Sequence, residues 1–369
     1  MPKTLHLVAG ARPNFMKLAP LVRALDRRSD EIGYRIVHTG QHYDRDMSDV
    51  FFEELGIPKP HFHLGAGGGS HAQQTARIMV AFEELCERER PDAVVVVGDV
   101  NSTLACSIVA KKLHIPVAHV EAGLRSGDRA MPEEINRLVT DAISDWFFVT
   151  EPSGVDHLLR EGHDATSIFH VGHVMADNVL YQRELIERHP LAGGEVVEYK
   201  NQHPRYGVVT MHRPSNVDDA AVFGRVAGAL REIARELPLV FPVHPRTRAN
   251  MERFGIDLGA RVTLMAPQSY MPFLYLWKDA TVVLTDSGGL QEETTALGVP
   301  CLTMRENTER PITAQEGSNT VVGTDPDRIV AEARKVLTGG GKLGRRPALW
   351  DGRAAERTVD HLIGLLQSP

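Results

Sequence analysis

The sequence predicts an α/β protein made of two Rossmann-like domains, each built on a doubly wound parallel β-sheet. Three observations support this prediction. Apolar, β-branched runs alternate with amphipathic helical patterns, and the series restarts after Gly172. Residues 94–97 are four consecutive valines, which is typical of a parallel strand covered on both faces. The length of 369 residues suits two domains at roughly 150 residues each.

Each apolar run predicts a strand, and the stretches between the runs predict helices, as at Phe15–Leu25, where apolar residues recur at helical spacing. The strands of the first series are expected at Leu5–Val8, Arg35–His38, Ala93–Val97, Val117–Val120, Trp146–Val149 and Ile168–Val171. Those of the second are expected at Tyr206–Met211, Leu239–Val243, Val262–Met265, Thr281–Thr285 and Cys301–Met304. We therefore expect an N-terminal domain over 1–172 and a C-terminal domain over 173–352, with a last helix within 353–369 that packs back on the first domain.

The composition excludes several classes of function. Lys plus Arg number 41 against 48 Asp plus Glu, a formal net charge of −7, which argues against a nucleic acid or a membrane surface as partner. A local basic pocket for a small anion remains compatible with this total. The three cysteines form no CxxC pair, no apolar run approaches the ~20 residues of a membrane helix, and the N-terminus is too short and broken for a signal sequence. These features predict a cytoplasmic protein.

Polar clusters directly follow most of the predicted strands. The carboxyl ends of parallel strands are where open α/β sheets bind ligands, so two sheets facing across a cleft would bring these clusters together. The clusters are Gly10–Asn14, Thr39–His42, Gly98–Asn101, Glu121–Gly123, His212–Pro214, His244–Arg246 and Asp286–Gly289.

The stretch Asp286–Glu293 joins a strand to a helix. Its paired glycines allow a ligand to approach the backbone, and a helix start offers N–H groups to a phosphate. A plain turn with an Asp or Ser helix cap explains the same residues equally well. The stretch lacks a P-loop lysine and a GxGxxG pattern, so neither a Walker site nor a dinucleotide fingerprint is predicted.

Acidic residues form the second candidate group. Asp99 and Glu121 each end an apolar strand, where desolvation can tune a carboxylate for proton transfer. Helix capping by Asp99, and an ion pair of Arg137 with Glu133 or Glu134, are the alternatives. The 17 histidines show no HExxH or Cys/His zinc spacing, so no metal is expected.

Taken together, these stretches resemble the non-hydrolysing UDP-N-acetylglucosamine 2-epimerases of bacteria and archaea, which share the GT-B arrangement of nucleotide-sugar glycosyltransferases. The resemblance covers essentially the whole chain. It rests on Gly10–Pro13, Lys17–Pro20, Thr39–His42, Gly98–Asp99, His119–Arg125, Met131–Arg137, His212–Arg213, Pro242–His244, Thr285–Glu293 and Thr308–Pro311.

The resemblance implies that UDP-GlcNAc and UDP-ManNAc are interconverted without a cofactor, by elimination of UDP and its re-addition through a bound 2-acetamidoglucal. Asp99, Glu121, Glu133 and His212 match the family's catalytic residues, and the sequence leaves open which carboxylate removes the C2 proton. The expected substrate and UDP contacts are Arg12, Lys17, Arg137, His244, Phe273, Ser287, Gly288, Gly289, Glu293 and Arg310. The resemblance also implies a homodimer.

The chain departs from the family pattern at a regulatory site for a second UDP-GlcNAc. Asp44 stands where relatives carry a second Gln, and the Gly67–Gly69 loop offers no cation, although Gln41 and His244 are present. We therefore expect weak or absent activation by substrate. His173 also replaces an Asn that many relatives carry.

Other functions remain as alternatives. The same elimination could act on UDP-2,3-diacetamido-2,3-dideoxyglucuronate, whose branch shows similar stretches, or a hydrolysing relative could release free ManNAc. A GT-B glycosyltransferase or a UDP-sugar binding protein belongs to another class. Neither of those would require Asp99, Glu121 and Glu133 together.

Overall fold

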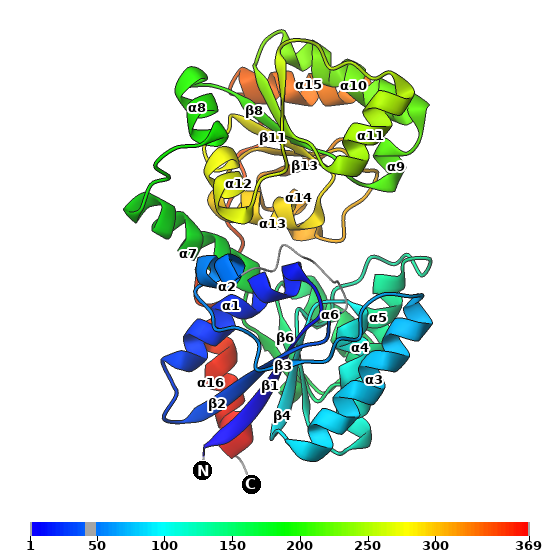
Figure 1. The fold of residues 1–369 in the computed structure, drawn as a ribbon, viewed down its shortest axis with the longest axis vertical. Helices are drawn as coiled ribbons and strands as arrows, with labels where there is room; N and C mark the ends of the chain where they lie inside the picture. Colours follow the sequence, from blue (N-terminus) through cyan, green and yellow to red (C-terminus); the bar gives the residue numbers. More distant parts are fainter. Residues whose placement is uncertain (1, 41–48, 368–369) are drawn as a thin grey trace. The chain divides into compact units, whose positions relative to one another are not determined.

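The computed structural model describes residues 2–40 and 49–367. The chain divides into two compact units, unit 1 with Met1–Asn178 and Ala348–Pro369, and unit 2 with Val179–Pro347 (Figure 1). The division falls inside helix α7 (Val174–Arg188), a few residues beyond the boundary after residue 172 expected from the sequence. Among the described residues, no helix combines the length and apolarity needed to cross a bilayer.

Unit 1 is built on a seven-stranded sheet of order β3-β2-β1-β4-β5-β6-β7, in which all neighbouring strands are parallel. The strands are β1 (Lys3–Ala9), β2 (Ile32–His38), β3 (Phe62–His63), β4 (Ala93–Val97), β5 (Val117–Val120), β6 (Trp146–Val149) and β7 (Ile168–His170).

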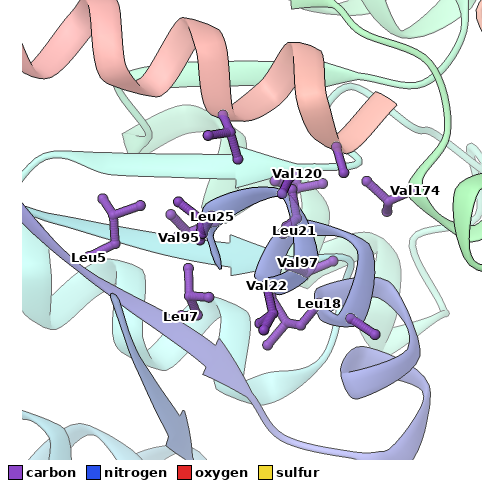
Figure 2. Close-up of a cluster of buried hydrophobic side chains, with 14 of the residues drawn as sticks. Leu5, Leu7, Leu18, Leu21, Val22, Leu25, Val95, Val97, Val120 and Val174 are labelled. Atoms are coloured by element: carbon purple, nitrogen blue, oxygen red, sulfur yellow. The ribbon is translucent and has the colours of Figure 1, made fainter. Parts of the chain in front are cut away.

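Helices cover both faces of this sheet. The helices of unit 1 are α1 (Arg12–Asp26), α2 (Asp49–Leu55), α3 (His71–Arg88), α4 (Asn101–Lys112), α5 (Pro132–Ile143), α6 (Pro152–Arg160) and α16 (Ala354–Gln367). Val95 and Val97 pack with α1, α2 and α16, whereas Val94 and Val96 pack with α3 and α4. Figure 2 shows the first of these cores, where Leu18 and Leu21 of α1 meet strand residues. The valine run is therefore buried on both sides, as the sequence predicted.

Unit 2 repeats the pattern with a six-stranded parallel sheet of order β10-β9-β8-β11-β12-β13. Its strands are β8 (Gly207–Thr210), β9 (Leu239–Pro242), β10 (Val262–Met265), β11 (Val282–Thr285), β12 (Cys301–Thr303) and β13 (Asn319–Val321). Its helices are α8 (Glu195–Gln202), α9 (Pro214–Val217), α10 (Ala220–Ala234), α11 (Pro245–Phe254), α12 (Tyr270–Trp277), α13 (Gly288–Leu297), α14 (Pro311–Gln315) and α15 (Pro326–Leu337). Helices α10 and α15 cover one face, and α12 and α13 contact the sheet as well. Both units thus show the predicted doubly wound parallel topology.

The strand order reverses once in each sheet, between β1 and β4 in unit 1 and between β8 and β11 in unit 2. Ligands of open α/β sheets bind outside the carboxyl ends of the strands at such switch points. The loops there begin at Gly10 and Gly98 in unit 1, and at Met211 and Asp286 in unit 2. The topology therefore places four of the polar clusters found in the sequence at the switch points, namely Gly10–Asn14, Gly98–Asn101, His212–Pro214 and Asp286–Gly289.

Gly172 lies in close contact with the backbone of Leu349 in the C-terminal segment of unit 1. Its φ is +92°, and a Cβ placed on it would lie 2.0 Å from the backbone oxygen of Leu349. Gly162 has a similar φ of +91° with no atom within 4 Å of that Cβ position. We expect Gly172→Ala to lower the free energy of unfolding by about 3 kcal/mol or more, because left-handed strain and steric overlap add. Gly162→Ala should cost only about 1–2 kcal/mol of strain. Urea titrations of both variants would measure the difference, and equal costs would show that the overlap is relieved.

Candidate functional site

The switch point of unit 1 holds an ion pair between α1 and the loop after β5. Lys17 Nζ lies 2.5 Å from Glu121 Oε2, and the Glu121 side chain is almost wholly buried. Glu121 has φ +69°, which is uncommon for a residue with a side chain and marks local strain of the kind that gathers at functional sites. Gly98 leaves the space for this pair, since a Cβ there would lie 3.1 Å from Lys17 Nζ. Asn14 links the same loops, because its side chain accepts from the backbone of Ala11 and donates to Val97.

A second ion pair holds Asp99. Arg137 Nη1 lies 2.5 Å from Asp99 Oδ2, and Nη2 of the same buried guanidinium lies 2.7 Å from Glu134 Oε2. Glu134 also accepts from the backbone N–H groups of Ser126 and Gly127. Although burial opposes ionisation, these donors lower the pKa of Glu134. The Arg137 partner left open by the sequence is therefore Glu134 rather than Glu133, and Asp99 does not cap α4, which begins after Val100 without a side-chain cap.

Asp99 and Glu133 line one pocket of about 290 Å³ on unit 1. Its other polar side chains are His71 and three amides, and the amides are joined in a chain: Asn101 Nδ2 donates to Gln74 Oε1 (2.8 Å), and Asn136 Nδ2 donates to Asn101 Oδ1 (3.1 Å). Among the described residues that line the pocket there is no lysine or arginine. The pocket thus combines two carboxylates with amides and one imidazole, a size and polarity that suit a sugar ring.

In unit 2, the loop after β8 carries His212 beside the buried carboxylate of Asp286. Asp286 accepts from the backbone N–H groups of His212 (3.0 Å) and Arg213 (2.9 Å), and its Oδ1 lies 3.1 Å from His212 Nδ1. About half of the His212 side chain remains exposed. With Nδ1 directed at a carboxylate, Nε2 is left as the nitrogen available to a ligand.

Helix α13 follows strand β11 and carries most of the Asp286–Glu293 stretch. Ser287 occupies its N-cap without a side-chain capping bond, so its hydroxyl is not committed to the plain cap considered from the sequence. Farther along, Glu293 accepts from the Tyr270 hydroxyl (2.9 Å). Arg310 forms an ion pair with Glu292, and Arg213 lies 4.0 Å from Glu309. Arg213 Nη2 lies 3.9 Å from the position of a Cβ on Gly288, so a guanidinium lies beside the start of α13, a combination that can bind an anion.

The other expected contacts occupy separate positions. Arg12 begins α1 with its guanidinium 5.1 Å from the centre of the Phe51 ring. His244 is the N-cap of α11, where Nδ1 accepts from the Arg246 backbone, and Phe273 is partly exposed on α12. His173, which replaces the family Asn, lies buried with Nδ1 4.0 Å from Glu121 Oε1. The residue at which this chain differs from many relatives, His173, therefore lies beside the candidate catalytic carboxylate of Glu121.

The Gly67–Gly69 loop supplies no cation of its own, but a cation from a neighbouring helix lies at it. Arg77 of α3 donates from Nη2 to the carbonyl oxygens of Gly67 and Gly68, so a guanidinium lies at the loop although no loop residue supplies it. Gln41 and Asp44 lie outside the described residues. Reduced activation by substrate therefore stays a prediction.

Glu293 should make the stability of unit 2 depend on pH. Burial raises its pKa to about 8, partly offset by the Tyr270 hydrogen bond and reinforced by the nearby Glu292. In the unfolded chain this group ionises near its ordinary pKa of 4.5, whereas in the folded protein it stays protonated up to about pH 8. The free energy of unfolding therefore falls by about 1.4 kcal/mol for each unit by which the pH rises between these two values. Glu293→Gln removes this loss, because the amide oxygen still accepts from Tyr270. We expect the variant to gain stability over wild type from pH 5 to pH 8 in thermal melts. The exposed Glu252→Gln variant should show no such trend.

No group of three or more His, Cys, Asp or Glu side chains is placed to hold a metal ion in residues 2–40 and 49–367. The titratable residues gathered at the two switch points instead form ion pairs and hydrogen bonds. Carboxylates, imidazoles and guanidinium groups of this kind can transfer protons and bind anions.

Comparison with known proteins identifies the chain. A family model described as UDP-N-acetylglucosamine 2-epimerase matches residues 23–363. The UDP-N-acetylglucosamine 2-epimerase of Methanocaldococcus jannaschii is 39% identical over 96% of this chain and 97% of its own length. The UDP-2,3-diacetamido-2,3-dideoxy-D-glucuronate 2-epimerase of Pseudomonas aeruginosa is 40% identical over 97% and 99%.

Solved structures agree. The crystal structure of the M. jannaschii UDP-GlcNAc 2-epimerase with UDP-GlcNAc and UDP superposes with a TM-score of 0.85 at 38% identity, covering 97% of this chain and 99% of that one. The Neisseria meningitidis UDP-GlcNAc 2-epimerase bound to UDP-GlcNAc has a TM-score of 0.85 at 27% identity, over 98% and 100%.

The two parallel-sheet units and their switch-point residues define a sugar-nucleotide enzyme of the GT-B type. The chain belongs to the UDP-N-acetylglucosamine 2-epimerase family, and it is an epimerase of the non-hydrolysing branch.

Proposed function

We propose that this enzyme interconverts UDP-GlcNAc and UDP-ManNAc. The observation that carries the proposal is the grouping of carboxylates in unit 1: Asp99 and Glu133 in one pocket, and Glu121 held by Lys17 at the adjoining strand end. A 2-epimerisation needs one group that takes the C2 proton and another that returns a proton on the opposite face. The relatives named for UDP-GlcNAc support the choice of substrate.

The residues suit an elimination followed by re-addition. A carboxylate of unit 1 takes the C2 proton while the bond between C1 and the UDP oxygen breaks, which leaves a C1–C2 double bond in the sugar. The departing diphosphate gains negative charge, and His212, Arg213, Arg310 and the start of α13 are the groups that would stabilise it. Protonation of C2 on its other face and return of the UDP oxygen to C1 complete the epimerisation.

The diacetamido uronate remains the second candidate substrate, because a relative with that name is equally similar to this chain. Its carboxylate would have to be accommodated near a sugar pocket lined by Asp99 and Glu133, where repulsion between like charges favours the neutral hexose. His71 of the lining and Arg137, which pairs with Asp99, are the groups that would have to offset this repulsion for the uronate.

One experiment separates these functions. The protein is incubated in D₂O with UDP-GlcNAc, or with the diacetamido uronate, and the sugar is followed by NMR. Formation of UDP-ManNAc with deuterium at C2 is the expected result. No exchange with UDP-GlcNAc together with turnover of the uronate would replace the proposal by the second candidate. A homodimer and a cytoplasmic location stay predictions, and light scattering coupled to size exclusion tests the first.

A further inference from the structure

A fully buried pair of side chains lies behind the loops that carry the candidate catalytic carboxylates. His119 on β5 and Asp141 on α5 expose none of their side-chain surface. His119 Nδ1 lies 2.6 Å from Asp141 Oδ1, and His119 Nε2 lies 2.9 Å from the backbone oxygen of Gly98. The elimination described above gives neither side chain a role.

Both ring nitrogens of His119 face oxygen atoms that can only accept hydrogen bonds. A neutral imidazole carries one N–H and could satisfy one of these partners, so two hydrogen bonds require the doubly protonated, positively charged ring. Asp141 is its counterion. Although burial opposes ionisation, His119 and Arg125 together lower the pKa of Asp141. These contacts are the ones that a buried imidazolium and a buried carboxylate would make, and Asp141 Oδ2 also lies 2.7 Å from Arg125 Nη1.

This ion pair joins three segments that carry candidate catalytic groups. Gly98, which accepts from His119, directly precedes Asp99. Asp141 Oδ2 accepts from the backbone N–H of Gly123 (3.0 Å), two residues after Glu121. Helix α5 carries Asp141 one turn after Arg137, the partner of Asp99. Movement of the pair would therefore change the separation of Asp99 and Glu121.

We propose that His119 is a positioning residue, kept doubly protonated by Asp141 and the Gly98 carbonyl, that holds Asp99 and Glu121 at the spacing needed for proton transfer at the sugar. The role assigned to the spacing rests on the proposed function. A displacement of about 1 Å in a reacting group can cost ~10²-fold in rate. The His119–Asp141 pair can therefore affect turnover through the positions of the two carboxylates, without contacting the substrate.

The protonation state of His119 is tested without substrate. In the two-bond ¹H–¹⁵N spectrum of ¹⁵N-histidine-labelled enzyme, both His119 nitrogens should show chemical shifts of protonated nitrogen, as hydrogen bonds from both ring nitrogens require. The His119 resonances are assigned as those that disappear in the spectrum of the His119→Asn variant. If that variant does not fold, they are assigned as those that shift in the Asp141→Asn variant. A nitrogen in the unprotonated range would overturn the proposal.

The positioning role is tested by kinetics against a matched buried histidine. His6 on β1 of the same sheet is equally buried and packs edge-on against Phe82, away from the catalytic loops. We expect His119→Asn to lower kcat ~10²-fold with KM within ~3-fold, and His6→Asn to leave kcat within ~2-fold. Assays are run at a temperature where circular dichroism shows both variants folded.

The outcomes separate this inference from the proposed function. If wild-type enzyme does not epimerise UDP-GlcNAc, the proposed function fails, while the NMR spectrum still tests the charged state of His119. If wild type is active and His119→Asn loses no more kcat than His6→Asn, or loses activity only through KM, the positioning role is wrong. Asp141→Asn should reproduce the kcat loss, and normal kcat in that variant would also contradict it.

Discussion

Replacing Glu121 by Gln should reduce epimerisation about 10³-fold while leaving UDP affinity unchanged. The amide has the same shape and its oxygen can still accept from Lys17, so the fold of the loop is retained. What is lost is the negative charge and the ability to take up a proton, and a positioned acid or base contributes about 10²–10⁴-fold. Because Glu121 is buried and strained, we expect a loss in the middle of that range and not at its lower end.

Two measurements check this expectation: deuterium incorporation at C2 in D₂O, and titration calorimetry with UDP. Asp145→Asn is the matched control. Asp145 accepts a hydrogen bond from the Val117 backbone at the amino end of β5, the strand that leads to Glu121. Replacing Asp145 therefore affects β5 at the end opposite to Glu121. Unchanged exchange in Glu121→Gln would remove this residue from the catalytic set. Exchange lost equally in Asp145→Asn would show that damage to the strand is responsible.

The sequence was sufficient to predict the two parallel sheets. Val94–Val97 was expected to be a strand with helices on both faces, and the structure shows this, with Asp99 two residues beyond its carboxyl end. The three-residue edge strand β13 escaped notice, because Asn319-Thr320-Val321 is too short for an apolar period. Its partner β12 supplies the pairing that holds it in an extended conformation.

The partners of the charged groups could not be settled from spacing. Arg137 is three residues after Glu134 and four after Glu133, and both spacings place side chains together on a helix. The choice depends on the turn before α5, whose N–H groups of Ser126 and Gly127 bind Glu134 and leave Glu133 to line the pocket. Such backbone donors come from chain folding and leave no pattern in the helix sequence.

The hydrogen-bond partner of Asp286 could not be predicted from sequence spacing either. In the sequence it is equally well explained as a turn residue before a helix. The parallel pairing of β8 with β11 sets Thr210 beside Thr285, and thereby brings the loop with His212 against the Asp286 carboxylate. A hydrogen-bond partner 74 residues away in the sequence is brought to Asp286 only by this register.

Asp286→Asn should therefore lower kcat about 10²–10³-fold through His212. The amide oxygen can take the place of Oδ2 and still accept from the His212 and Arg213 backbone. The NH₂ group then stands at Oδ1, where it cannot accept a hydrogen bond from His212 Nδ1. An amide in place of a carboxylate beside a catalytic imidazole costs up to ~10⁴-fold where the wrong tautomer results, as in the serine protease triad, and the partly exposed His212 should be less sensitive.

A double-mutant cycle gives this prediction its sharpest form. In a His212→Gln background, Asp286→Asn should reduce kcat by less than ~3-fold, because residues that act as one unit are not additive. Asp325→Asn is the control, since Asp325 also accepts from two backbone N–H groups of unit 2 but caps α15 instead of facing a histidine. Fully additive losses would mean that Asp286 only supports the fold of the loop. A kcat loss that disappears with His212 instead identifies Asp286 as the group that orients the histidine, because a general loss of stability would persist in either background.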